Sequence, residues 1–306
     1  MFKLIASMSL VVIALTARTA EADAPLRVTY AGSMGVVMDR GLGPAFAAIG
    51  HVEYEGQGEG SYGMARLLAS KKIVADVFVS ITPGPMKILE DAGLIDEAVP
   101  VASTNVVIAF NPRSPFAKQL EQSRVGQGAL WWQVLESPGL RFGRTDPTID
   151  PSGQNIIFAL MLAEKYYKQP GLAHKILGDV ENPREVFADG GLLTRLEAGQ
   201  IDASAGYESA TISAKLPYIA LPDEINLSNP QFAQSWYQTV SFDVRDASGK
   251  TATLRPQPLV FYAAVLKNAP NPMQARNFVS FMQSRQGQAI FRQNGYREAK
   301  GASPFR

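Results

Sequence analysis

The chain of 306 residues contains no cysteine. This absence excludes disulfides, thiolate metal sites, cysteine nucleophiles and a lipid anchor on an N-terminal cysteine. The chain also has no large excess of positive or negative charge, since the formal net charge is +1 and no long run of Lys or Arg occurs. We therefore expect neither nucleic-acid binding nor polybasic attachment to a membrane.

Long apolar runs are also scarce, and the one that occurs lies at the start of the chain. Lys3 precedes an apolar run over residues 4–15, which is shorter than the roughly 20 residues that a bilayer span requires. Ala20-Glu21-Ala22 has the small-x-small pattern of a cleavage site. We predict a signal peptide over residues 1–22, a mature chain that begins near Asp23, and export to a bacterial periplasm.

The rest of the chain alternates strand and helix patterns. About 280 residues exceed the size at which a single core usually stops growing, which favours two domains. Apolar runs typical of strands and helical apolar periodicity alternate along the early part of the chain, and this order favours a mainly parallel sheet flanked by helices. Strands are predicted over residues 26–30, 51–55, 75–80, 105–110, 201–205 and 259–266, and helices over 86–92, 156–167, 191–198, 272–283 and 287–293.

Two segments rich in proline, glycine and polar residues divide the chain, at residues 111–115 and 246–258. They predict that one lobe is inserted into the other. Lobe one would comprise residues 23–110 and 259–306, and lobe two would comprise residues 111–258. Two-lobed α/β proteins of this kind bind ligands in the cleft between the lobes, which a hinge opens and closes.

Two serines follow glycines at predicted strand-to-helix turns, in Ala31-Gly32-Ser33 and Gly58-Glu59-Gly60-Ser61. Hydroxyl groups and free backbone N–H groups at a helix start, together with the helix dipole, attract anions. Since the two turns belong to neighbouring βα units, Ser33 and Ser61 are candidates for binding one small anion.

These turns allow other interpretations. Each serine can be a simple helix N-cap without a ligand. Ser33 also fits a nucleophile elbow of a serine hydrolase, which would need one of the two histidines, His51 or His174, as its base. The glycines of the second turn match a dinucleotide fingerprint, but the acidic residue expected after the next strand stands before it, as Asp76.

The middle of the chain offers two further turns. In Asp150-Pro151-Ser152-Gly153, the aspartate precedes a proline and is expected to be extended, and Ser152 is a candidate cap of a helix that begins near Gly153. Gly206-Tyr207-Glu208-Ser209 follows a predicted strand. Without a ligand, the first would be a proline-rich loop and the second a strand end with a solvated Glu208.

Taken in order, these motifs resemble the tungstate/molybdate-binding proteins of ABC importers. The resemblance rests on Ala31-Gly32-Ser33, Gly60-Ser61, Ala75-Asp76-Val77, Asp150-Pro151-Ser152-Gly153, Gly206-Tyr207-Glu208-Ser209 and the string over residues 221–228. It covers nearly the whole mature chain. It implies a two-lobed periplasmic-binding-protein fold without enzymatic activity or a cofactor, in which tungstate or molybdate is the ligand. The partners would be a membrane permease and its cytoplasmic ATPase, and the protein is expected to be a monomer.

The resemblance also implies roles for particular residues. Ser33 and Ser61 would donate hydrogen bonds to the oxyanion, and Ser152 and Tyr207 would add to this set. Asp150 matches the first of two carboxylates that contact the metal atom. The second carboxylate matches either Glu208 or the position of Gly206, which has no side chain.

The carboxylate bears on the choice of ligand. An ionised aspartate repels sulfate, whereas tungsten or molybdenum can accept it as an additional oxygen ligand. A protonated phosphate can donate a hydrogen bond to it. Sulfate is therefore the least compatible anion if Asp150 reaches the ligand, and phosphate remains an alternative.

Overall fold

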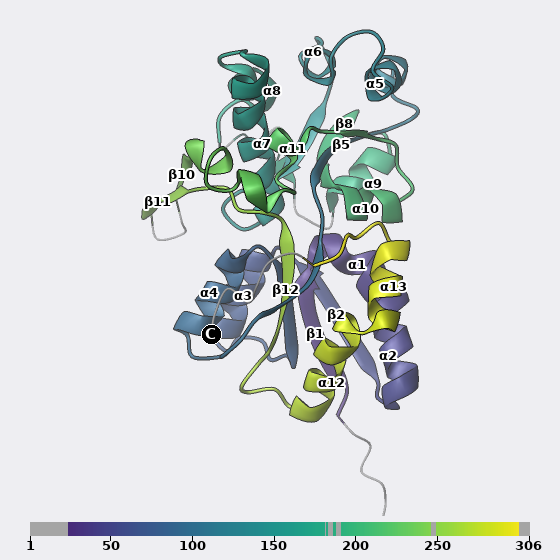
Figure 1. Ribbon diagram of the computed structural model, residues 1–306, viewed down its shortest axis with the longest axis vertical. Helices are drawn as coiled ribbons and strands as arrows, with labels where there is room; N and C mark the ends of the chain where they lie inside the picture. Colours follow the sequence, from purple (N-terminus) through teal and green to yellow (C-terminus); the bar gives the residue numbers. More distant parts are fainter. Residues whose placement is uncertain (1–23, 181, 183–185, 188–190, 246–248, 300–306) are drawn as a thin grey trace, which may run out of the picture.

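The computed structural model describes residues 24–180, 182, 186–187, 191–245 and 249–299. The predicted signal peptide lies outside these residues. Within them, no helix combines the length and the apolar character needed to cross a membrane. The molecule consists of two lobes stacked along its long axis, and lobe one contains both the purple-to-blue N-terminal part and the yellow C-terminal helices (Figure 1). The predicted two-lobed α/β architecture is confirmed.

Lobe one is built on a five-stranded sheet with the strand order β2-β1-β3-β12-β4. Its strands are β1 (Leu26–Ala31), β2 (Tyr54–Glu59), β3 (Val77–Ile81), β4 (Val99–Ser103) and β12 (Val260–Val265). The strand expected over residues 51–55 begins only at Tyr54, because His51 has the left-handed backbone (φ 49°) that ends the preceding helix.

Helices cover both faces of this sheet (Figure 1). They are α1 (Gly35–Val37), α2 (Gly43–Gly50), α3 (Ser61–Ala69), α4 (Pro83–Asp91), α12 (Pro272–Gln283) and α13 (Arg285–Gln293), with the short turns η1 (Gly32–Met34) and η2 (Met38–Leu42). The strands alternate as a two-faced sheet requires. Val77 and Val79 belong to the core beneath α2, α12 and α13, whereas Phe78 packs with Met64 and Leu89 of α3 and α4.

Lobe two has its own five-stranded sheet, in the order β7-β6-β8-β5-β9. The strands are β5 (Val106–Phe110), β6 (Phe142–Thr145), β7 (Val186–Phe187), β8 (Ala203–Tyr207) and β9 (Tyr218–Ala220), and a separate hairpin joins β10 (Phe242–Arg245) to β11 (Thr251–Leu254). The helices are α5 (Ala117–Arg124), α6 (Trp131–Leu135), α7 (Pro151–Tyr167), α8 (Leu172–Leu177), α9 (Leu192–Glu197), α10 (Glu208–Ser213) and α11 (Asp223–Asn226), with the turns η4 (Pro230–Phe232) and η5 (Tyr237–Thr239).

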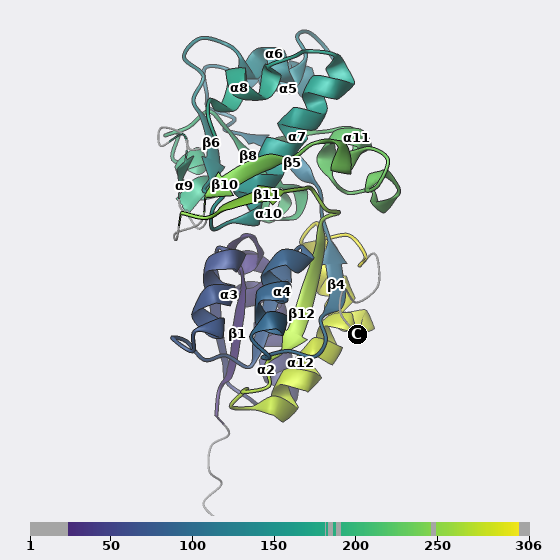
Figure 2. The same cartoon turned by 90° about the vertical axis from the view of Figure 1, so that its left-hand side faces the viewer.

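Each five-stranded sheet contains one reversed strand. β1 pairs in parallel with β2 and β3, and β6 pairs in parallel with β7 and β8. β12 and β5 are antiparallel to both of their neighbours. These two are the strands that enter a lobe from the other one, so the reversals mark the connections between the lobes (Figure 2).

The first connection lies earlier than predicted. The segment over residues 105–110 was expected in lobe one, but β5 pairs with β8 and β9 and belongs to the sheet of lobe two. The crossing is the pair Thr104-Asn105, which contains neither glycine nor proline and therefore has no signature in the sequence. The return crossing occupies residues 255–259, next to the expected boundary at 258.

Helix α7 also begins earlier than predicted. Asp150 is its N-cap, since its Oδ1 accepts a hydrogen bond from the Ser152 N–H at 3.0 Å. The expectation that Ser152 caps the helix is therefore wrong, although the extended backbone expected for Asp150 is present (φ −127°, ψ 123°). The proline at the first helical position favours this start, because its fixed φ suits a helix and its missing N–H has no partner there.

Gly153 allows the first turn of α7 to lie against the end of β6. A Cβ at this position would lie 2.2 Å from the carbonyl oxygen of Thr145, which is backbone and cannot rotate away. We expect Gly153→Ala to reduce the free energy of unfolding by about 1–3 kcal/mol, as overpacking does.

Gly63 is the matched control, since it lies within α3 and a Cβ there would meet no atom within 4 Å. Gly63→Ala should raise stability by up to about 1 kcal/mol through helix propensity. Denaturant unfolding of both variants measures the difference. Equal stabilities of the two variants would contradict the close packing of α7 on β6.

Candidate functional site

A cavity of about 100 Å³ lies between the two lobes. This volume is well below the roughly 300–1,000 Å³ of pockets for drug-sized ligands, so it suits a small ligand. Its lining comes from the turn after β1, the ends of β6 and β8, and the helices α7, α9 and α10. The lining residues are Gly32, Ser33, Thr145, Ser152, Leu192, Leu193, Ala205, Gly206, Tyr207 and Ala210.

Three of the predicted site residues meet at this cavity: Ser33, Ser152 and Tyr207. Ser33 belongs to lobe one, and the other two belong to lobe two. Ser33 follows β1, Ser152 lies in the first turn of α7, and Tyr207 ends β8. Ligands in α/β folds bind at such strand ends and helix starts. Among the described residues that line the cavity there is no Lys, Arg or His, so the polar groups that these residues offer are hydroxyl and backbone groups.

Ser61 and Asp150 do not line the cavity but are buried beside it. A Cβ at Gly60 would lie 3.6 Å from the Cβ of Asp150, so the turn before Ser61 packs directly on the Asp150 segment of the other lobe. The Ser61 Oγ and the Asp150 Oδ2 are both inaccessible, and neither has a hydrogen-bond partner within the described structure. Two predicted site residues thus present unpartnered polar atoms at the seam between the lobes.

Burial governs the charge of Asp150, which is 5% exposed. Removal from water raises the pKa of this carboxyl to about 6. The neighbouring Thr145 hydroxyl and Ser152 N–H lower the pKa, whereas the charge of Asp146 raises it further. Near neutral pH the group is mostly ionised, and a modest change in its surroundings is enough to protonate it.

The Tyr207 side chain is hydrogen-bonded to Asn155, a residue that the sequence did not indicate. Tyr207 is 2% exposed, and its hydroxyl oxygen accepts a hydrogen bond from the Asn155 Nδ2 at 2.9 Å. Leu192 and Leu193 form an apolar wall of the cavity that was also missed. Helical periodicity accounts equally well for a core helix, so it could not single out these residues.

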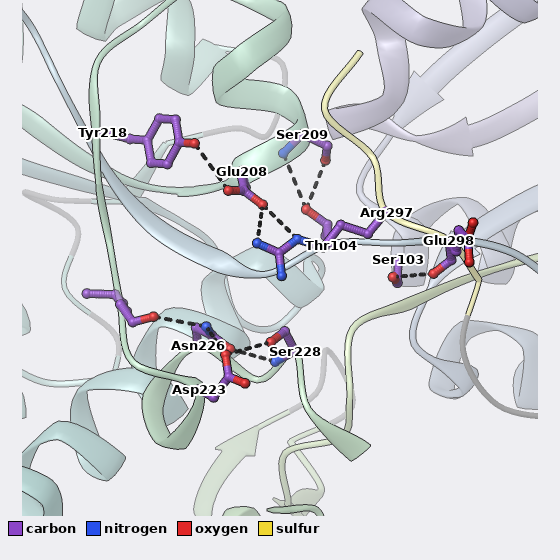
Figure 3. Close-up of polar contacts among 11 residues, drawn as sticks. Ser103, Thr104, Glu208, Ser209, Tyr218, Asp223, Asn226, Ser228, Arg297 and Glu298 are labelled. Atoms are coloured by element: carbon purple, nitrogen blue, oxygen red, sulfur yellow. Dashed lines mark hydrogen bonds and ion pairs between the residues drawn. The ribbon is translucent and has the colours of Figure 1, made fainter. Parts of the chain in front are cut away.

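Glu208 does not lie at the cavity, which corrects its prediction as a metal contact. Its carboxylate accepts hydrogen bonds from the Arg297 Nε at 3.0 Å and the Tyr218 hydroxyl at 3.1 Å (Figure 3). The physical reason is that the chain changes from strand to helix after Tyr207, so Glu208 no longer continues the strand face of Gly206. Gly206, the other candidate for this position, lines the cavity.

Arg297 belongs to the segment after α13 in lobe one, so its ion pair with Glu208 joins the two lobes. The segment is held on β4, where Ser103 and Arg297 exchange backbone hydrogen bonds of 3.0 and 2.9 Å. Beside it, the Ser209 N–H and hydroxyl lie 3.3 and 3.1 Å from the Thr104 Oγ1 (Figure 3). Glu208 therefore links lobe two to lobe one beside the first crossing.

The competing interpretations of the serine turns agree less well with the geometry. Neither Ser33 nor Ser61 caps a helix through its side chain. His174, one of the two possible hydrolase bases, is an exposed residue 3.7 Å from Asp179 in lobe two, and no histidine lines the cavity. The cavity volume is also too small for a dinucleotide. No group of three or more His, Asp or Glu side chains suited to a bare metal ion occurs in the described residues.

Comparison with known sequences gives matches over most of the chain. Residues 26–297 match the model of a family described as bacterial extracellular solute-binding protein. The molybdate/tungstate-binding protein WtpA of Thermococcus kodakarensis is 26% identical over 303 residues, which cover 91% of this chain and 83% of that protein. A putative ABC transporter molybdenum-binding protein of Haloferax volcanii is 30% identical over 243 residues, which cover 79% and 72%, respectively.

An uncharacterized solute-binding protein of Petrotoga mobilis is 34% identical over 196 residues, and this match covers 63% of this chain. It spans only 59% of the Petrotoga protein, less than two thirds of its length.

Solved structures share the fold at low sequence identity. The periplasmic molybdate-binding protein of Azotobacter vinelandii has a TM-score of 0.63 and 16% identity, covering 90% of this chain and 100% of that chain. The sulfate-binding protein SubI of Mycobacterium tuberculosis has a TM-score of 0.60 and 16% identity, covering 89% and 85%. Proteins named for different anions thus have this fold, so the fold alone does not select the ligand.

The raised pKa of Asp150 predicts how stability depends on pH. Because the folded state holds the proton more tightly than the unfolded chain, the stabilisation is complete below pH 3.8 and is lost as the pH rises to about 6. Between these limits the group should reduce the free energy of unfolding by about 3 kcal/mol. Asp150→Asn keeps an oxygen that can cap α7, but its free energy of unfolding should lack this dependence on pH. Urea unfolding of wild type and Asp150→Asn between pH 4 and 7, without added anion, measures this dependence. If the free energies of unfolding of the two proteins change with pH in parallel, the prediction is contradicted.

The position of Glu208 predicts a structural role without a ligand contact. Glu208→Gln should lower the free energy of unfolding by about 1 kcal/mol or less, since Arg297 is partly exposed. The variant should bind the oxyanion with an affinity within about threefold of that of the wild type. Arg297→Gln is the matched partner, and a double-mutant cycle of unfolding free energies should be non-additive. A large loss of affinity in Glu208→Gln with normal affinity in Arg297→Gln would restore Glu208 as a ligand contact.

Proposed function

Because the chain belongs to the bacterial extracellular solute-binding proteins, we propose that it captures tungstate or molybdate and delivers the anion to an ABC importer. The predicted signal peptide supports a periplasmic location. The relatives named for molybdate, tungstate or molybdenum support this choice of ligand. The partners are a membrane permease and its cytoplasmic ATPase, and the protein acts as a monomeric carrier without chemical turnover or a cofactor.

The observation that carries the proposal is the small cavity between the lobes, lined by hydroxyl-bearing residues from both of them. Ser33 reaches it from lobe one, and Ser152 and Tyr207 reach it from lobe two. Ser61 adds a buried hydroxyl without a partner at the adjoining seam. Hydrogen bonds from such donors to a charged oxygen contribute roughly 1.5–3 kcal/mol each, and they require no positive side chain.

Asp150 supports a metal oxyanion over sulfate. Its Oδ2 is buried and has no hydrogen-bond partner among the described residues, and the nearby Thr145 and Ser152 line the cavity. An ionised carboxylate beside sulfate is repulsive, whereas tungsten or molybdenum can accept an additional oxygen ligand. With Gly206 in place of a second carboxylate, Asp150 alone would supply this contact, and the hydroxyl groups would bind the oxygens.

Binding would stabilise the closed form by hinge motion. A ligand that contacts both lobes binds the closed form more tightly than the open one, and this difference shifts the equilibrium between them. The two crossings at 104–105 and 255–259 provide the hinge. Small-angle scattering with and without the anion reports the change in shape.

The direct test is calorimetric titration with tungstate, molybdate, sulfate and phosphate. We expect the wild type to bind tungstate and molybdate at least tenfold more tightly than sulfate. Asp150→Asn should weaken tungstate binding roughly tenfold, as loss of a charge-assisted contact does. Its affinity for sulfate should stay equal or rise, because a repulsive charge is removed.

Other outcomes identify the alternatives. Tight sulfate binding that Asp150→Asn leaves unchanged would refute the metal contact and indicate a carrier of another oxyanion. Tight binding of phosphate alone would indicate a phosphate carrier. Ser33→Ala should weaken anion binding only. Hydrolysis of a nitrophenyl ester by the wild type that disappears in Ser33→Ala would instead support a secreted hydrolase.

A further inference from the structure

Thr145 is the last residue of β6, and its hydroxyl lies near the carboxyl of Asp150. The residue is 1% exposed and lines the cavity between the lobes. Its Oγ1 is inaccessible and lacks a hydrogen-bond partner in the described structure. A buried hydroxyl without a partner is costly, so its presence at a cavity calls for an explanation.

The surroundings of Thr145 hold it in place. Its carbonyl oxygen lies against Gly153 of α7, where even a single added carbon would collide. As a β-branched residue in a strand, threonine has few side-chain orientations. The hydroxyl therefore has few orientations, and the Asp150 carboxyl is the neighbouring group that it influences.

The carboxyl ends of β6 and β8 bring Thr145 near other residues of the cavity lining. β6 and β8 are parallel, with Phe142 opposite Ala203 and Gly143 opposite Ser204, and Thr145 and Tyr207 are the last residues of the two strands. Gly206 also lines the cavity, and Ser152 lines it from the start of α7. Thr145 thus lies between two parts of the proposed site, at the carboxyl end of a parallel strand.

We propose that Thr145 is a further anion-binding residue, whose hydroxyl donates a hydrogen bond to an oxygen of the bound tetrahedral oxyanion. This rests on the proposed function, since it adds a donor to the same site. The competing role is indirect: the Thr145 hydroxyl also influences the carboxyl of Asp150, and it could act only by positioning that group. The two roles differ in what happens when Asp150 loses its charge.

The test compares Thr145→Val, which replaces the hydroxyl by a methyl group of similar size, with Thr145→Ser, which keeps the hydroxyl. Titration with tungstate should give an affinity roughly tenfold lower for Thr145→Val and within threefold of wild type for Thr145→Ser. The melting temperature of Thr145→Val without anion should be equal or higher, because an unpartnered buried hydroxyl is removed. Thr145→Ala provides a second hydroxyl-free variant if valine disturbs the fold.

Thr211→Val is the matched control. The residue is fully buried and does not line the cavity, and its Oγ1 has no hydrogen-bond partner in the part of the chain that the structure describes. Removal of the Thr211 hydroxyl should leave tungstate affinity within threefold of that of the wild type. An equal loss in both variants would mean that removal of any buried hydroxyl weakens binding, and it would overturn the assignment of Thr145.

A double-mutant cycle with Asp150→Asn separates the two roles. If Thr145 contacts the anion, Thr145→Val should again lower affinity roughly tenfold in the Asp150→Asn background. If the loss disappears there, Thr145 acts only through Asp150 and the proposal is overturned. Full affinity of Thr145→Val overturns it as well. A wild type that binds none of the four oxyanions refutes the proposed function itself, which is a different result from wild-type binding that the substitution leaves unchanged.

Discussion

Two short crossings join the lobes, and their hydrogen bonds fix where the two halves of the site meet. The Thr104 N–H donates to the Leu259 carbonyl at 3.1 Å, so the outgoing and returning crossings are held together. The Glu208 N–H donates to the Asn105 carbonyl at 3.0 Å, which ties the start of α10 to the same point. Since Gly206 and Tyr207 directly precede Glu208, the cavity and the hinge share one continuous stretch of chain.

The second constraint is the burial of polar groups at the seam. The hydroxyls of Ser61 and Thr145 and one oxygen of Asp150 are inaccessible and have no partner in the described structure. Polar atoms of this kind lower stability unless something binds them. A ligand that supplies acceptor oxygens for the hydroxyls would offset this cost, and only the closed arrangement brings both lobes within reach. Affinity and closure would then have the same physical origin.

The sequence predicted where helices and strands lie better than which strands and side chains pair with one another. The helix over residues 272–283 was predicted with the observed bounds, and the strand at 26–30 was predicted to within one residue, because capping and apolar patterns are local. The membership of β5 was wrong, because its composition does not depend on which sheet it joins. For the site, a local turn pattern indicated Ser33, and the family resemblance added Ser152 and Tyr207; the three meet at the cavity. The resemblance left Glu208 and Gly206 open as the second carboxylate position, and Glu208 instead pairs with Arg297, 89 residues away.

By itself, the sequence determined which residue types stand at strand ends and helix starts, and that no cysteine chemistry is available. These are consequences of local propensity and composition. Only the tertiary structure decided which of two neighbouring positions, Gly206 or Glu208, faces the cavity, and that Thr145 belongs to its lining. The physical reason is that a side chain's direction at the end of a strand depends on where the chain turns. Its partners depend on segments brought together by the packing of the two lobes.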